Sequence, residues 1–151
     1  MFVIRPATFA DRTTIRQVIF KAGLFPFRMN WRRFLVVEAS GSIVGVGQVR
    51  AHGDGSLEVA SIAVVPTWQG KGVGSALVRA LVERESSDLY LFCLEKREGF
   101  YSRLGFLRCE PHQLPPSLAR IHRVVNWLGS RVARMRKQGF SLLAMKRTIL
   151  S

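Results

Sequence analysis

Residues 66–75 read PTWQGKGVGS and place three glycines at alternate positions just before a helical pattern begins. Glycine in a helix interior costs about 1 kcal/mol relative to alanine, so this concentration needs a specific reason. The amide groups in the first turn of a helix lack partners within the helix and carry partial positive charge. Glycines at that point let a phosphate approach the amides closely. The stretch therefore predicts a site for a phosphorylated ligand.

Two common phosphate-binding motifs fit this stretch poorly. A Walker A loop requires a glycine five residues before Gly70, where Val65 stands, and its lysine must be followed by serine or threonine rather than Gly72. A dinucleotide fingerprint, G-x-G-x-x-G, has Ser75 in place of its third glycine. It also requires an acid at the end of the next strand, whereas Asp88 opens that strand. Neither motif accounts for the three glycines.

The rest of the chain alternates between helix and strand patterns around this stretch. Helices are predicted from residue 8 to a stop at Gly23, at 72–85 and at 95–104. Strands are predicted at 3–6, 34–39, 43–49, 56–66, 88–94, 106–109 and 140–149. Ser-Gly-Ser and Gly-Asp-Gly turns join the second, third and fourth strands into an antiparallel meander. We therefore predict one α+β domain over residues 1–151, with a mixed, mainly antiparallel sheet, flanking helices and one parallel strand pair.

The formal net charge of +13 is distributed unevenly along the chain. Residues 1–110 contain 15 basic and 10 acidic residues, whereas residues 111–151 contain 8 basic residues and no acid. Such a basic segment favours polyanions, including nucleic acid, the ribosomal surface, anionic lipid or a phosphorylated cofactor. A solvated cationic face is the alternative.

Several classes of protein are disfavoured by what the sequence contains. The apolar runs are too short to span a bilayer, and the first residues lack the pattern of a secretory signal. Cys93 and Cys109 form no CxxC motif, and three histidines accompany them, so we expect neither a disulfide framework nor a metal site. We expect a reducing, cytoplasmic setting.

Three segments together resemble the GNAT superfamily of N-acetyltransferases. Residues 69–74, QGKGVG, resemble the family's Q/R-x-x-G-x-G/A motif within the longer block IAVVPTWQGKGVGSAL. GFYSRLGF at 99–106 resembles the family's later segment around a helix-borne tyrosine, and VIRPATFADRTTI resembles its first strand and helix. The resemblance covers residues 1–108 and the last strand. It implies transfer of an acetyl group from acetyl-CoA to an amine, carried by a small molecule or a protein.

The resemblance also implies how acetyl-CoA would be held, without a metal. The thioester would lie where the two parallel strands, ending near Val65 and Leu94, splay apart. Backbone groups of Ile62, Ala63 and Val64 would bind the pantetheine arm as an added strand would. The pyrophosphate would lie against the glycine stretch, with the binding residues Gln69, Gly70, Lys71, Gly72, Val73, Gly74 and Ser75.

Glu58 is the candidate general base. An alkylammonium has a pKa of about 10, so acetylation requires a group that accepts its proton. Glu58 is the only acidic residue between Asp54 and Glu83, and a strand period of two places it on the same face as Val64. The resemblance implies the role of base at this position. A structural ion pair with an arginine is the alternative.

Tyr101 is the candidate acid for the departing thiolate. It matches the tyrosine of the family's F-Y-x-x-L-G-F segment, and a phenol combines an apolar ring with a proton donor. A core tyrosine packed against Leu104 is the alternative, and both descriptions can hold at once. Cys93 is predicted to be a small buried hydrophobe rather than a nucleophile.

Residues 109–138 depart from the family, which reaches its last strand by a shorter connection. We predict a basic helical insert with Ser117 as N-cap and one apolar seam along its length. The seam comprises Leu118, Ile121, Val125, Leu128, Val132 and Met135. The insert either packs on the body near the acceptor or presents a partner or polyanion surface. The insert leaves the identity of the acceptor open. A homodimer is possible. The alternative function is a non-catalytic acetyl-CoA-binding module or a basic RNA- or ribosome-associated module of the same fold.

Overall fold

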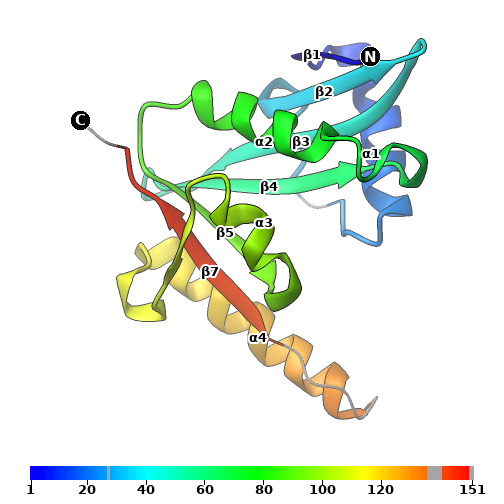
Figure 1. The fold of residues 1–151 in the computed structure, drawn as a ribbon. Helices are drawn as coiled ribbons and strands as arrows, with labels where there is room; N and C mark the ends of the chain where they lie inside the picture. The colour runs from blue at the N-terminus through cyan, green and yellow to red at the C-terminus, as the bar shows by residue number, and fades with distance from the viewer. Residues whose placement is uncertain (27, 136–140, 150–151) are drawn as a thin grey trace. The chain divides into compact units, whose positions relative to one another are not determined.

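The computed structural model describes residues 1–26, 28–135 and 141–149, with side chains of the last helix described through Val132 (Figure 1). The strands are β1 (Val3–Pro6), β2 (Phe34–Ala39), β3 (Ser42–Ala51), β4 (Leu57–Val64), β5 (Leu89–Leu94), β6 (Leu107–Cys109) and β7 (Leu142–Arg147). The helices are α1 (Arg12–Lys21), α2 (Val73–Glu83), α3 (Glu98–Ser102) and α4 (Pro116–Met135). None of the helices in these described ranges is long and apolar enough to cross a membrane.

The strands form one sheet in the order β1-β2-β3-β4-β5-β7-β6. β1 pairs antiparallel with β2, β2 with β3, and β7 with both β5 and β6. β4 and β5 run parallel, with Leu57 opposite Leu89 and Glu58 opposite Tyr90. The predicted α+β fold, with a mainly antiparallel sheet and a parallel pair, is confirmed. The chain divides into two compact units, residues 1–50 with 59–86 and residues 51–58 with 87–151.

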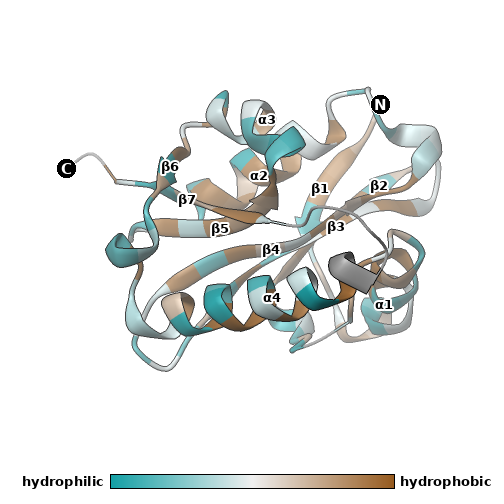
Figure 2. Ribbon diagram, turned by 90° about the horizontal axis from the view of Figure 1, so that it is seen from below, coloured by the Kyte–Doolittle hydropathy of each residue, from teal (hydrophilic) through white to brown (hydrophobic). Residues whose placement is uncertain are grey.

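In the first unit, apolar residues at helical spacing hold α1 on the sheet. Ile15, Val18 and Ile19 are buried in one cluster with Phe34 and Val46. Burial of such side chains stabilises the folded state by about 1.5–3 kcal/mol each. Figure 2 shows the strands as mainly hydrophobic and α1 as mixed in character.

Helix α2 packs closely on β3 because two positions of that strand are glycine. A Cβ added to Gly47 would lie 2.5 Å from Cδ1 of Ile62 and 3.1 Å from Cδ1 of Leu81, and one added to Gly45 would lie 3.1 Å from Cγ1 of Val73. Real Cβ atoms essentially never approach other atoms to 2.5 Å, and an approach of 3.1 Å requires the neighbouring side chain to shift by a few tenths of an ångström. Larger residues in β3 would push α2, and with it the glycine stretch, away from the sheet.

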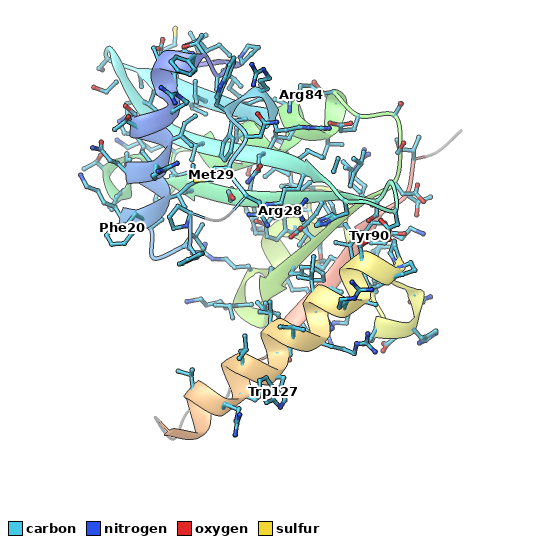
Figure 3. All side chains as sticks on the ribbon, turned by 180° about the vertical axis from the view of Figure 1, so that it is seen from behind. Phe20, Arg28, Met29, Arg84, Tyr90 and Trp127 are labelled. Atoms are coloured by element: carbon cyan, nitrogen blue, oxygen red, sulfur yellow. The ribbon has the colours of Figure 1, made fainter. Side chains whose placement is uncertain are left out.

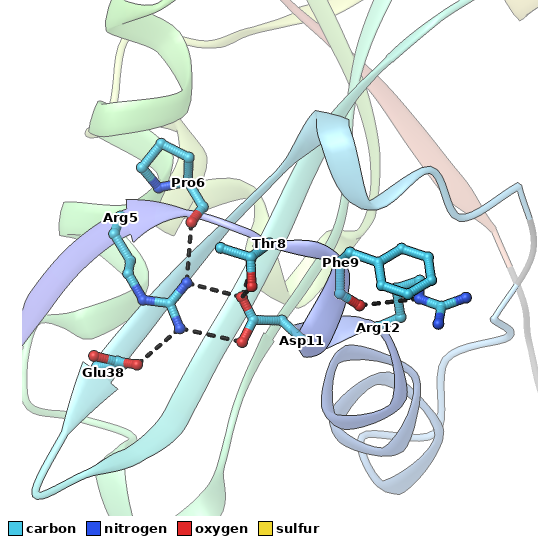
Figure 4. A network of polar contacts seen from close by, with 7 residues as sticks. All are labelled: Arg5, Pro6, Thr8, Phe9, Asp11, Arg12 and Glu38. Carbon is cyan, nitrogen blue, oxygen red and sulfur yellow. Dashed lines mark hydrogen bonds and ion pairs between the residues drawn. The ribbon is translucent and has the colours of Figure 1, made fainter.

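A charged network ties the start of the chain to β2 (Figure 4). The guanidinium of Arg5 donates to both carboxylate oxygens of Asp11 at 2.8 and 3.1 Å and to Glu38 at 2.7 Å. Asp11 also accepts from the amide and hydroxyl of Thr8, at 2.7 and 3.0 Å. These bonds, with that from Arg5 the strongest, lower the pKa of Asp11 to about 2.

The second unit is built around β5, paired along its length with β7. Its cluster contains Tyr90, Leu118 and Ala144. Cys93 is buried in β5 with its sulfur 3.7 Å from that of Met145, and burial raises the pKa of its thiol. The prediction that Cys93 is a buried hydrophobe is confirmed.

Helix α4 begins two residues earlier than predicted, because Ser117 as N-cap would make Leu118 its first residue. Its first residue is Pro116, and Ser117, the predicted N-cap, lies inside the first turn. The amide of Ser117 donates instead to the carboxylate of Asp54 at 2.9 Å. Proline is favoured at a first helical position because its missing N–H would have had no partner there. The serine prediction was wrong because the cap comes from a turn more than sixty residues earlier in the chain, whose acceptor the local sequence does not reveal.

The predicted apolar seam of α4 is wrong in its second half. Leu118 is buried, but Leu128 and Val132 are 51% and 49% exposed. Polar residues take the inner positions instead, since His122 bonds to the carbonyl of Leu142 at 2.8 Å and Asn126 accepts from its amide at 2.7 Å. Three parts of these predictions lie outside the described residues: the side chain of Met135, residues 136–138 of the insert, and the strand start at 140.

Candidate functional site

The glycine loop, residues 69–72, connects a short 3-10 turn (Pro66–Trp68) to α2. Gly70 and Gly72 adopt left-handed φ angles of 76° and 81°, and a Cβ added to either would meet nothing within 4 Å. Gly72 is the N-cap of α2 and supplies no side chain to cap it. The first amide with a helical partner is that of Ala76, which donates to the carbonyl of Gly72 at 3.1 Å. The amides before Ala76 have no partner within the helix, and no side-chain cap bonds them at Gly72.

Two side chains of the loop region have contacts of their own. Gln69 donates through Nε2 to the carbonyl of Val64 at 3.0 Å, which ties the loop to the end of β4. The Lys71 ammonium lies 5.0 Å from the centroid of the Trp68 ring, in a cation–π contact. Val73 is buried, so only its amide can serve a ligand. Open amides, left-handed glycines and one lysine fit the pyrophosphate group predicted for this stretch.

Strand β4 contains a residue in an unusual conformation. Ser61 has a left-handed φ of 58°, which is costly for a residue with a Cβ, by about 1–3 kcal/mol. Its hydroxyl accepts from Nε2 of Gln48 at 2.9 Å and from the guanidinium of Arg50 at 3.4 Å. Such a residue interrupts the regular alternation of a strand. The alternation that placed Glu58 and Val64 on one face therefore does not continue through Ser61.

The residues beyond Ser61 differ in burial. Ala63 is buried within the core of the first unit, and Ile62 and Val64 are half-buried. The carbonyl of Val64 is the group that holds Gln69. Binding of a pantetheine arm to this segment stays a prediction.

Glu58 lies in β4 and forms a buried pair with His52. Nε2 of His52 is 2.9 Å from Oε1 of Glu58, and both side chains are almost fully buried. An ionised Glu58 would accept this hydrogen bond from the Nε2–H tautomer of His52. The two residues flank the Gly-Asp-Gly turn, His52 just after β3 and Glu58 in β4. His52 was not among the site residues predicted from the sequence, although a histidine six residues from a strand glutamate across a tight turn was a usable signal.

Tyr101 lies in α3 and is enclosed by aromatic rings. Its ring centroid is 4.9 Å from that of Phe100 and 6.1 Å from that of Phe106, both edge to face. Burial, and to a smaller extent the charge on Cys93, raise the pKa of Tyr101 to about 12. Tyr101 is partly exposed, and its phenol stays protonated over the physiological range.

The predicted residues fall in both compact units. The glycine loop and residues 62–64 belong to the first unit, whereas Glu58 and Tyr101 belong to the second. Within the first unit, the contact from Gln69 to Val64 joins the predicted pyrophosphate and pantetheine segments. Within the second, the structure joins Glu58 to His52.

Comparisons with known proteins identify the family of the chain. A family model described as an acetyltransferase (GNAT) domain matches residues 30–108, slightly more than half of the chain. An uncharacterised N-acetyltransferase of Chlorobaculum tepidum is 27% identical over 92 residues, which cover 59% of this chain and 59% of that protein. The chain thus spans less than two thirds of that relative.

Solved structures share the fold. N-acetylglutamate synthase from Neisseria gonorrhoeae, in complex with coenzyme A and N-acetyl-glutamate, matches with a TM-score of 0.78 at 18% identity, over 100% of this chain and 36% of that one. Rv2747 from Mycobacterium tuberculosis, in complex with CoA and NLQ, matches with a TM-score of 0.72 at 21% identity, over 98% and 99%. The resemblance found in the sequence is confirmed: this chain belongs to the GNAT acetyltransferase family.

Proposed function

We propose that this protein is an N-acetyltransferase that moves the acetyl group of acetyl-CoA to an amine. The observation that carries the proposal is the glycine loop, where left-handed Gly70 and Gly72 leave the first amides of α2 open to an anion. Membership of the GNAT family supports it. Coenzyme A in the complexes of the Neisseria and Mycobacterium proteins supports the same choice of donor.

The residues present fit the donor's charged part. The amides from Gly70 to Ser75 would hold the pyrophosphate, Lys71 would add positive charge, and Gln69 would keep the loop against β4. Residues 62–64 would offer backbone groups to the pantetheine arm. When bound, acetyl-CoA supplies the thioester whose carbonyl carbon the amine attacks.

Glu58 would accept the proton of the amine, directly or through water. The contact with Nε2 of His52 would hold the Glu58 carboxylate in one orientation. A positioned base raises the fraction of neutral amine at the moment of attack. His52 acts through Glu58 and is a positioning residue in this proposal.

Tyr101 would donate a hydrogen bond to the departing sulfur. Its pKa of about 12 is well above the value of about 8.5 for a free thiol. Complete proton transfer to the thiolate is therefore uphill, and the phenol acts mainly by stabilising the developing charge, while solvent supplies the final proton. The predicted role as acid is narrowed to hydrogen-bond donation.

The charge of the protein supports acceptors that carry negative charge. A protein of formal charge +13 attracts acidic molecules and repels polycationic ones at long range. Two free cysteines in the described structure suit a reducing compartment, and we place the protein in the cytoplasm. A non-catalytic acetyl-CoA-binding module is the alternative tested below.

The direct test is calorimetry with acetyl-CoA followed by a thiol-release assay over a panel of amines, amino acids and peptides. We expect saturable acetyl-CoA binding and release of thiol that depends on at least one amine. Tight acetyl-CoA binding without thiol release for any acceptor class would favour the non-catalytic module. Absence of acetyl-CoA binding would refute the proposal.

Variants separate the two candidate catalytic residues. Tyr101→Phe should lower kcat about 10- to 1,000-fold with little change in acetyl-CoA affinity. Glu58→Gln should weaken the acidic limb of the pH profile, because that limb reports protonation of the base. His52→Gln retains a donor and should change the profile less than His52→Ala. A loss of stability without a change in turnover would assign a structural role to the residue concerned.

A further inference from the structure

The outer face of α4 combines an aliphatic row with an arginine row. The aliphatic row consists of Val124, Leu128 and Val132, each about half exposed and spaced four residues apart over about 12 Å of helix. The arginine row consists of Arg120, Arg123 and Arg131, all exposed, on the adjoining strip of the same helix face. Trp127, 57% exposed, lies within the arginine row, and the Arg131 guanidinium covers its ring at 4.7 Å.

The opposite face of α4 is occupied by its own unit. Leu118 is buried, His122 stacks on Phe92 with ring centroids 5.4 Å apart, and Asn126 exchanges hydrogen bonds with Leu142. The helix is therefore held by its inner face, and the outer face is presented to solvent. Figure 3 shows Trp127 on the part of α4 that extends past β7.

The sequence segment that contains this face carries charge of one sign. Residues 111–151 contain 8 basic residues and no acidic one. A convex helix face with aliphatic and tryptophan side chains beside arginines has the composition of helices that lie in the headgroup region of a membrane. Arginine stems can cover apolar surface while their charges reach phosphate groups.

We propose that this face of α4 docks on an anionic lipid surface, independently of the acetyl-transfer proposal. A second copy of the chain would bring two like-charged segments together. A nucleic acid would engage the arginines but leave the aliphatic row in water. A bilayer interface accommodates a convex face and takes both rows at once, with the arginines at the phosphates and the aliphatic row at the acyl boundary.

Flotation with lipid vesicles tests the proposal. The full chain should float with vesicles of phosphatidylcholine and phosphatidylglycerol and only weakly with phosphatidylcholine alone, and added salt should reduce binding. Each basic residue near an anionic surface strengthens binding about fivefold, so replacing all three row arginines by glutamine should weaken it roughly a hundredfold. Replacing Val124, Leu128 and Val132 together by serine should weaken it at least about tenfold.

The control removes an exposed apolar residue elsewhere. Leu107 in β6 is 73% exposed, and Leu107→Ser should leave vesicle binding unchanged. Calorimetry with acetyl-CoA and circular dichroism establish that each variant is folded. A protein with Trp31 and Trp68 replaced by phenylalanine reports on Trp127, whose fluorescence should shift to the blue on anionic vesicles and not on neutral ones.

Three results would overturn the proposal. The first is failure of the wild-type protein to float with anionic vesicles at every salt concentration. The serine variant could bind as well as wild type, which would mean simple polyanion attraction that an RNA oligonucleotide should share. Light scattering could show a wild-type dimer that the serine variant converts to a monomer, which would assign the face to a second copy.

Discussion

The first turns of α2 and α4 both have backbone amides without partners within the helix, but the residues beside these amides differ. At α4 the carboxylate of Asp54 receives the amide of Ser117 at 2.9 Å, so an internal anion occupies the start of the helix. At α2 the N-cap is Gly72, which has no side chain, and a Cβ added there would meet nothing within 4 Å. One helix start is capped by a carboxylate of the chain itself, whereas the other has a glycine N-cap and open space beside it.

The difference separates a capped helix terminus from one that we propose as a ligand site. Partial positive charge is present at every such terminus and cannot by itself distinguish a site from a structural cap. The distinction lies in the residue types around it. Asp54 is held by Ser56 as well as by Ser117, and these hydrogen bonds, that from the Ser56 hydroxyl first, hold its pKa well below the usual range. Around Gly70 and Gly72 no carboxylate is bonded within the described residues.

The largest expected effect comes from placing an anion at the open terminus. Gly72→Asp should weaken acetyl-CoA binding by several kcal/mol, or about a hundredfold or more, through repulsion of the pyrophosphate and loss of amide contacts. Isothermal titration calorimetry measures this directly. Unchanged affinity in a folded variant would remove the glycine loop from the binding site.

Gly41→Asp is the matched control for that substitution. Gly41 has a φ of 76° and also has nothing within 4 Å of an added Cβ, but it lies in the β2–β3 turn. Strain at left-handed φ should destabilise both variants to a similar degree. Only Gly72→Asp should lose acetyl-CoA affinity, so equal losses would mean that strain rather than charge explains the effect.

A second effect tests an internal carboxylate near the start of α1. The pKa of Asp11 is lowered from 3.8 to about 2, chiefly by Arg5. A lowered pKa stabilises the fold above about pH 4, and this contribution is lost as the pH falls toward 2. Asp11→Asn should therefore cost about 2 kcal/mol at neutral pH and almost nothing near pH 2. Urea unfolding at both pH values measures the difference.

Glu38→Gln is the comparison for Asp11→Asn, because Glu38 bonds the same guanidinium but is more exposed. Exposed ion pairs contribute little to stability. We expect a smaller loss for Glu38→Gln at neutral pH. An equal loss would assign the stabilisation to Arg5 as a whole rather than to the carboxylate at the helix start.

A third and smaller effect is expected at the start of α4. Asp54→Ala should lower the melting temperature by a few degrees, because the Ser117 amide loses its acceptor. Asp54→Asn keeps a side-chain oxygen and should recover part of the loss. Because the pKa of Asp54 is depressed, the difference between wild type and Asp54→Ala should be present above about pH 4 and shrink on acidification. A difference that is independent of pH would contradict the role of the charged carboxylate.

The sequence predicted those features that local residue patterns determine. The hairpin turns and the apolar periodicity of α1 and α2 predicted the fold class, and the phosphate site at the glycine stretch stays a prediction. Partners that meet across long separations could not be predicted in the same way. The bond from Asp54 to Ser117 and the anchoring of α4 by Asn126 on Leu142 depend on how the chain returns, which explains the errors at the cap and in the seam.

The pairing of His52 with Glu58 is intermediate between these cases. The two residues are only six apart, and the turn between them was predicted. The abundance of arginine in the sequence favoured an arginine as the structural partner of Glu58, and the nearby histidine was not considered. The left-handed conformation of Ser61 could not be predicted, because serine is not a residue type that marks an irregularity in a β-rich run.

The smallest expected effect concerns the acceptor and contrasts the acid-free segment with the rest of the chain. With Arg120, Arg123 and Arg131 replaced by glutamine, each substitution removes one positive charge, so the net charge falls from +13 to +10. At 0.01 M salt the Debye length is about 30 Å, so charges far from an acceptor still act on it. We expect wild type to prefer acidic over basic peptides in the thiol-release assay, and the triple variant to show that preference about threefold more weakly. Rising salt should bring the two proteins together. If basic peptides are preferred at low salt, acidic groups close to the acceptor outweigh the field of the whole protein.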